Sequence, residues 1–153
     1  MKKILLIPLA LLLAACAAAP AEPTVPSTAE RQVWEDANIS HYRFALTLSC
    51  FCAFRDQMPL TIEVKDGEVV SMTDGDGKSI PSDDVNYEFF LSYATIDKLF
   101  TKIESAQADP EAGEVTVTYD PTYGYPVEAA IDYIELAADD EMYLTVSGFE
   151  ALP

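Results

Sequence analysis

From residue 42 onward the chain alternates apolar and polar side chains with a period of two, which predicts β-strands. The first such stretch places Tyr42, Phe44, Leu46 and Leu48 on one face, with small or polar residues between them. Because only one face is apolar, we expect a strand that is buried on one side. The same alternation predicts five further strands, within residues 60–64, 68–73, 115–119, 127–133 and 142–146.

Two segments instead follow the pattern of amphipathic helices. Ser27 and Glu30 form a capping-box pattern ahead of a short helix over residues 31–37, whose one large apolar side chain is Trp34. The second helix follows Thr95, a residue suited to capping, and its apolar positions recur at i, i+3, i+4 and i+7. These positions are Ile96, Leu99, Phe100 and Ile103.

The predicted order is helix, three strands, helix, three strands, with short connections. Grouped strands joined by tight turns favour an α+β fold, in which two helices pack on a largely antiparallel sheet of about six strands. We expect residues 31–150 to form this single globular domain. In the hairpin around Asp66-Gly67, a three-residue loop sets Ile62 opposite Val70 and keeps apolar residues facing each other.

The segment before the domain has the pattern of an exported lipoprotein. Two lysines precede an apolar run over residues 4–15, which suits a secretory signal and is too short to span a bilayer. Leu13-Ala14-Ala15-Cys16 resembles the bacterial lipobox, in which cleavage precedes a lipid-modified cysteine. We therefore expect residues 1–15 to be a signal peptide and Cys16 to carry acyl chains such as palmitate. The alternative is ordinary secretory cleavage beside an unmodified cysteine.

Residues 16–30 are rich in proline and alanine, a composition that favours an extended tether. Two or more acyl chains on Cys16 would anchor the protein stably to a membrane of the cell envelope. In a cell with two membranes, an Asp directly after the lipidated cysteine usually marks retention in the inner membrane. Residue 17 of this chain is Ala. This favours the outer membrane, on its periplasmic or outer side.

Charge restricts the partners of the mature chain. Residues 16–153 keep all 26 acidic residues and lose two of the nine basic ones, so the formal net charge falls from −17 to −19. Binding to nucleic acid needs clustered Lys and Arg, which are scattered here, so we expect no nucleic-acid partner. A solvated acidic coat that keeps the protein monomeric is favoured over an acidic recognition surface.

Cys50-Phe51-Cys52 is the sharpest chemical signal. In a regular strand the two Cα atoms would lie about 6.6 Å apart, at the upper edge of the disulfide range, so a bond requires a kink or a bulge. A structural disulfide is favoured, while free buried thiols and a redox or metal-binding pair stay open. No adjacent Lys or His is present to lower a thiol pKa.

Other candidates for chemistry are weak. Asp74-Gly75-Asp76-Gly77-Lys78 begins like a calcium loop, but Val85 stands where the twelfth-position Glu is needed. His41 is the only histidine, which excludes a two-histidine zinc site. We expect no metal, no cofactor and no enzymatic activity, with an envelope hydrolase as a remote alternative.

The connection that follows residue 119 carries two tyrosines that its turn chemistry does not require. Pro121 and Gly124 suit a turn, whereas Tyr123 and Tyr125 add aromatic surface of the kind found at binding sites. Rings folded over the end of the core are the favoured interpretation. A binding surface is the alternative.

Five motifs stand in order along the chain: His41-Tyr42-Arg43-Phe44, Ser49-Cys50-Phe51-Cys52, Val64-Lys65-Asp66-Gly67, Thr95-Ile96-Asp97-Lys98-Leu99-Phe100 and Tyr119-Asp120-Pro121 through Gly124-Tyr125-Pro126. Together they resemble one family of bacterial lipoproteins, a domain of unknown function of type 6174, over about residues 31–150. The resemblance implies an envelope protein without known activity, so no catalytic residue is carried over. We expect a lipid-anchored, non-enzymatic binding module with a possible envelope protein partner; the alternative is a thiol-redox accessory protein using Cys50 and Cys52.

Overall fold

A computed structural model describes residues 29–153 and places the first strand of the chain beside the last. Six strands form one sheet in the order β3-β2-β1-β6-β5-β4, and every neighbouring pair is antiparallel. The predicted α+β class and antiparallel sheet are therefore confirmed. The strands are β1 His41–Ser49, β2 Leu60–Lys65, β3 Glu68–Thr73, β4 Val115–Tyr119, β5 Pro126–Ile131 and β6 Met142–Ala151.

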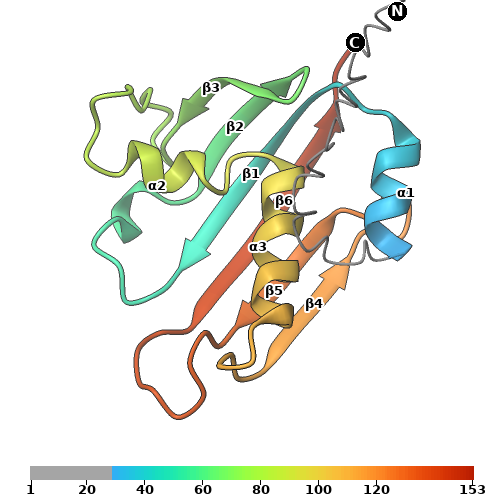
Figure 1. Cartoon of the computed structure of the whole chain (residues 1–153). Coiled ribbons are helices and arrows are strands. Elements are labelled where there is room, and N and C mark those ends of the chain that lie inside the picture. Colours follow the sequence, from blue (N-terminus) through green and yellow to red (C-terminus); the bar gives the residue numbers. More distant parts are fainter. Residues whose placement is uncertain (1–28) are drawn as a thin grey trace, which may run out of the picture.

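Helices cover one face of this sheet and leave the other face without a helix (Figure 1). They are α1 Ala29–Ala37, α2 Tyr87–Leu91 and α3 Ile96–Ala108, with a short 3-10 helix at Arg55–Gln57. The core lies between these two layers. The predicted stripe of α3 is fully buried in it, and the Thr95 hydroxyl caps the helix by accepting from the Lys98 amide over 3.2 Å. Trp34 of α1 is buried as well.

The prediction of two helices needs a correction, because α2 is a third helix within residues 29–153. It has five residues, too few for a repeating apolar stripe, so periodicity gave no signal for it. Its anchor is Phe90, which is fully buried and lies edge-on to Phe54 with ring centroids 5.1 Å apart.

The register predicted for the β2–β3 hairpin is wrong. Asp66 and Gly67 both have positive φ, 53° and 80°, so they form a two-residue loop that pairs Lys65 with Glu68. A bulge between Glu63 and Val64 then shifts the pairing by one residue. Ile62 consequently faces buried Met72, and Val70 is 54% exposed.

The proposed signal peptide, Cys16 and the capping residue Ser27 lie outside the described residues. Within residues 29–153, no helix combines the length and the apolar character needed to cross a membrane.

Candidate binding surface

The helix-free face of the sheet carries a small array of side chains on β4, β5 and β6. Two rows of cross-strand neighbours run across these strands. Short side chains at most positions leave a hollow of about 310 Å³ over the array. The first row is Thr116, Ala130 and Tyr143, and the second is Thr118, Glu128 and Thr145.

Tyr143 is the prominent side chain of this array. It is 55% exposed, although it lies on a strand whose neighbouring residues Met142 and Leu144 are buried. Two further hollows, of about 210 and 220 Å³, also reach this tyrosine. An aromatic ring thus stands among three adjoining depressions at one end of the sheet, and we call the residues that line them the Tyr143 surface.

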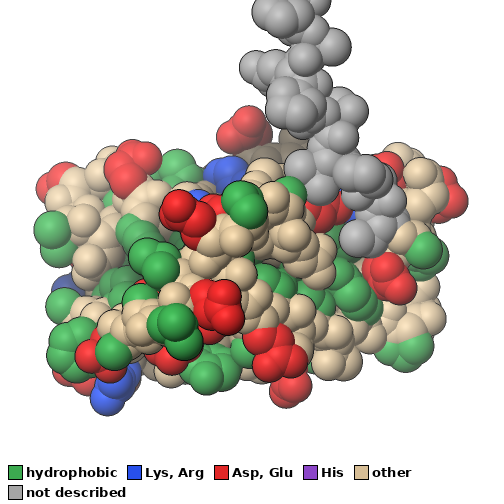
Figure 2. Space-filling model, turned by 60° about the horizontal axis from the view of Figure 1, so that its bottom comes forward, with side chains coloured by type: hydrophobic (Ala, Val, Ile, Leu, Met, Phe, Trp, Pro, Cys, Tyr) green, Lys and Arg blue, Asp and Glu red, His purple; other side chains and the backbone are tan. Residues whose placement is uncertain are grey.

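Carboxylates dominate the charge of the Tyr143 surface. Arg55 is its one basic residue. Among residues 29–153, no ion pair or side-chain hydrogen bond engages these carboxylates. Figure 2, which brings the lower end of the molecule forward, shows acidic side chains spread over that side and few basic ones. The carboxylates belong to Glu114, Glu128, Asp132, Asp139 and Glu141.

The position of Asp132 depends on a glycine. A Cβ on Gly113 would collide with the Asp132 carboxyl group, and the Gly113 amide donates to the Asp132 carbonyl over 3.0 Å. The absence of a side chain at residue 113 therefore makes room for one of the carboxylates of the surface.

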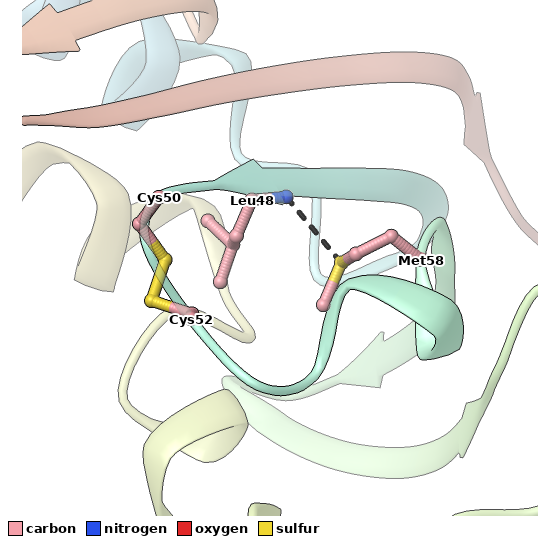
Figure 3. Close-up of a disulfide and its surroundings, with 4 residues drawn as sticks. All are labelled: Leu48, Cys50, Cys52 and Met58. Carbon is pink, nitrogen blue, oxygen red and sulfur yellow. Dashed lines mark hydrogen bonds between the residues drawn. A yellow bond between two sulfur atoms is a disulfide. The ribbon is translucent and has the colours of Figure 1, made fainter.

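The two cysteines border the same surface. Cys50 and Cys52 form a disulfide with Cα atoms 5.1 Å apart, and β1 ends one residue earlier, so the chain has left strand geometry where the bond requires it (Figure 3). Beyond the bond, the Leu48 amide donates to the Met58 sulfur over 3.4 Å. Phe51, between the cysteines, is 84% exposed and lines the third hollow together with Cys50.

The tyrosines predicted as a candidate binding surface lie at the other end of β5. Tyr125 is only 9% exposed, because its ring stacks on Phe149 with centroids 4.5 Å apart and meets the edge of Trp34. Burial raises the pKa of the Tyr125 hydroxyl above its usual value. Tyr123 is half-buried and tilted against Phe149. Both rings therefore contact the core.

His41 is held between two acceptors. Its Nδ1 lies 3.0 Å from the Pro153 carbonyl oxygen, and its Nε2 lies 3.0 Å from Glu63 Oε1. Both partners accept hydrogen bonds, so they favour the doubly protonated ring, and the bond to Glu63 is the largest cause of the raised pKa of His41. With both nitrogens engaged in this way, the ring is poorly placed to act as a general base.

The acidic turn that resembled a calcium loop uses its first carboxylate internally. Asp74 Oδ1 accepts from the amides of Asp76 and Lys78 over 3.0 and 2.8 Å, an Asx-type arrangement. Within residues 29–153, no group of three or more potential metal ligands converges.

Sequence reasoning missed Tyr143, Phe51 and Glu128. A signal was present for two of them, because the alternation that buries Met142 and Leu144 places Tyr143 on the outer face, and Glu128 lies outward in the same way. No local pattern places Phe51 at the same hollow as Tyr143, since this depends on the pairing of Ser49 of β1 with Tyr143 of β6.

Residues 27–151 match the model of a family described as "Family of unknown function (DUF6174)". No curated protein and no solved structure matches the chain.

Proposed function

Because the chain belongs to the Family of unknown function (DUF6174), which assigns no activity, we propose from its own residues that it is a lipid-anchored binding module of the bacterial cell envelope. The observation that carries this proposal is the Tyr143 surface. An exposed aromatic ring within a polar margin is the composition of a protein contact site, where Tyr, Trp and Arg supply most of the binding energy. The hollows around the ring are already formed in the unbound chain.

The position of the N-terminal end of the domain relative to the Tyr143 surface supports the same function. Gly124 lies against Glu30, so the N-terminal end of α1 packs beside the turn between β4 and β5. Tyr143 of β6 pairs with Ala130, near the other end of β5. A chain anchored through Cys16 would therefore enter the domain at the end of β5 remote from Tyr143, so the point of entry does not cover the Tyr143 surface.

Site-specific photocrosslinking in intact cells tests the binding function. A photoreactive amino acid replaces Tyr143 in the full chain, and a matched variant carries it at Val70, which has nearly the same exposure at the far edge of the sheet. We expect a discrete crosslinked adduct from position 143 and none from position 70. Equal yields of adducts from the two positions, or none from either, would contradict the binding function.

The lipid anchor has a separate test. We expect Cys16→Ala to prevent lipid attachment, so that the protein stays unprocessed or is released in soluble form. Detergent-phase partitioning of the full chain measures this directly, and unchanged partitioning of the variant would exclude the anchor. Density-gradient fractionation then decides between the outer membrane, which we propose, and the inner membrane.

A second candidate function is thiol exchange, favoured by one observation. Cys50 lines a solvent-facing hollow that also contains the guanidinium-bearing Arg55, and a neighbouring cation stabilises a thiolate. Mass spectrometry of the exported protein, with and without reductant, establishes whether the bond exists in the cell. Oxidation of a dithiol substrate to its disulfide, with the Cys50–Cys52 bond reduced to two thiols in the same exchange, would support this function if it is lost in Cys50→Ser/Cys52→Ser. If the full chain oxidises no dithiol substrate, the bond has a structural role only.

A further inference from the structure

We infer that the Tyr143 surface receives arginine or lysine side chains from a basic segment of a partner protein. This inference rests on the binding function proposed above and names the chemistry of the partner. Three features of the surface lead to it: the shape of the hollow, its uncompensated charge and the exposed ring.

The hollow suits a side chain that projects from a larger molecule. Ala130 and Thr145 are short, and they separate the taller side chains of Tyr143 and Glu128, which are diagonal neighbours on adjacent strands. The depression between them lies on an open sheet face and does not enclose a ligand. Small-molecule sites usually bury most of their ligand's surface, so a partner that brings its own covering surface fits this hollow better.

The charge of the surface indicates that its occupant is positively charged. Five carboxylates line the three hollows, Arg55 is the one cation among the lining residues, and none of the carboxylates is paired within residues 29–153. Unpaired carboxylates that line adjoining hollows attract an incoming cation and repel an incoming anion. A second copy of this acidic chain is therefore a poor occupant, because its formal net charge is −17 over the whole sequence.

The exposed ring favours the same class of occupant. A guanidinium or ammonium group over the face of a tyrosine is attracted by the ring quadrupole. Glu128 in the first hollow, and Glu141 in the other two, can then accept hydrogen bonds from cations seated in the hollows that they line. A neutral sugar would also stack on the ring, but it would leave the negative charge of the surface uncompensated.

The surroundings favour a protein segment over a free amine. Phe51 is 84% exposed beside the third hollow, and the loop after β5 exposes Ile134 and Leu136 at the same end of the sheet. A small polyamine cannot cover these apolar groups. A polypeptide that carries basic and apolar side chains together can cover them.

The probe for this inference is a blocked hexapeptide of alternating arginine and leucine, titrated by calorimetry into the full chain in non-ionic detergent. We expect Tyr143→Ala to weaken binding about tenfold, which corresponds to a cation–π contribution of about 1.4 kcal/mol. Tyr143→Phe should bind like the wild type, because it keeps the ring. Glu128→Gln should weaken binding at least threefold, whereas Glu68→Gln, which removes the same charge on β3 at the far edge, should change it less than twofold.

Other results overturn the inference. Equal losses for Glu128→Gln and Glu68→Gln would show general charge attraction, and spermidine binding as tightly as the peptide would show a site for free amines. Binding of a neutral hexasaccharide, abolished by Tyr143→Ala while the peptide fails to bind, would assign the surface to carbohydrate. Circular dichroism confirms that each variant is folded before titration.

The two proposals fail separately. If crosslinking from position 143 succeeds and the crosslinked partner segment contains no arginine or lysine, the binding function stands and the basic partner is wrong. If crosslinking from positions 143 and 70 is equal, the binding function itself is wrong.

Discussion

Arg31 of α1 and Glu104 of α3 form an ion pair between two helices, in which Arg31 Nη1 donates to Glu104 Oε2 over 2.6 Å. The Glu104 side chain is only 8% exposed, and that of Arg31 is 21% exposed. The same guanidinium lies 5.5 Å from the centroid of the Phe100 ring and 3.2 Å from Glu35. This one side chain therefore ties the first described helix to the helix at the centre of the core.

Removing the cation from this pair should be costly. Arg31→Met leaves the Glu104 carboxylate buried and without its partner, so we expect the free energy of unfolding to fall by about 3 kcal/mol. The matched control is Arg43→Met, which breaks an exposed pair with Glu150 and should cost less than about 1 kcal/mol. Urea unfolding measures both.

A compensating variant sharpens this test. Arg31→Met/Glu104→Leu replaces the buried carboxylate with an apolar side chain and should recover much of the lost stability, because no buried charge is left unpaired. If Arg31→Met and Arg43→Met cost the same, the pair between α1 and α3 contributes no more than a surface contact.

The two tyrosines of the turn between β4 and β5 should differ in their effect on stability. Tyr125 is buried against Phe149 and Trp34, so Tyr125→Ala should lower the free energy of unfolding by about 3 kcal/mol. Tyr123 is half-buried, so Tyr123→Ala should lower the free energy of unfolding by about 1 kcal/mol. Urea unfolding of the two variants gives the order, and a larger loss for Tyr123 would contradict this packing.

The elements that the sequence predicted well are those whose signal is local. Four buried residues in alternation mark β1, and a helical stripe behind Thr95 marks α3, because in both cases periodicity records which face meets the core. The five residues of α2 lack the length to express a period. The bulge at Glu63/Val64 sets which residues of β3 point into the core, and the sequence of the turn alone does not determine this.

The order of the strands and the Tyr143 surface depend on contacts between distant segments. β1 and β6 lie about a hundred residues apart in sequence, and their pairing brings the disulfide loop beside Tyr143. Alternation can place Tyr143 on an outer face, but it cannot say which residues surround the ring. The candidate site therefore needed the structure, while the fold class did not.

His41 gives a pH dependence of known sign. Its pKa in the folded chain is raised above 6.5, chiefly by the hydrogen bond to Glu63 and also by the Pro153 carbonyl, while burial and Lys65 oppose the rise. The stability that this contact supplies is therefore fully present below about pH 6.5 and is lost as pH rises through the folded pKa. We expect Glu63→Gln to bring the pKa back toward its usual value.

Proton NMR is suited to this measurement, because the chain contains a single histidine and its ring signals are unambiguous. Glu128→Gln serves as the control, since it removes the same charge from β5, a strand that does not touch His41. It should leave the imidazole pKa nearly unchanged. Equal shifts in the two variants would mean that the net charge of the protein, and not the bond to Glu63, raises the pKa.

Gly124 is the position where α1 comes closest to the turn between β4 and β5. Its φ is 76°, and a Cβ there would collide with the Glu30 carbonyl oxygen and lie 3.0 Å from the Val33 Cβ. Gly77 has a similar φ of 79° with nothing within 4 Å of such a Cβ, so Gly77→Ala measures the left-handed backbone alone, at about 1–2 kcal/mol. Gly124→Ala should add about 1–3 kcal/mol of overpacking to that cost. Urea unfolding measures the loss of stability in the two variants. Equal losses would show that α1 can move away from this turn without cost and is not held against it.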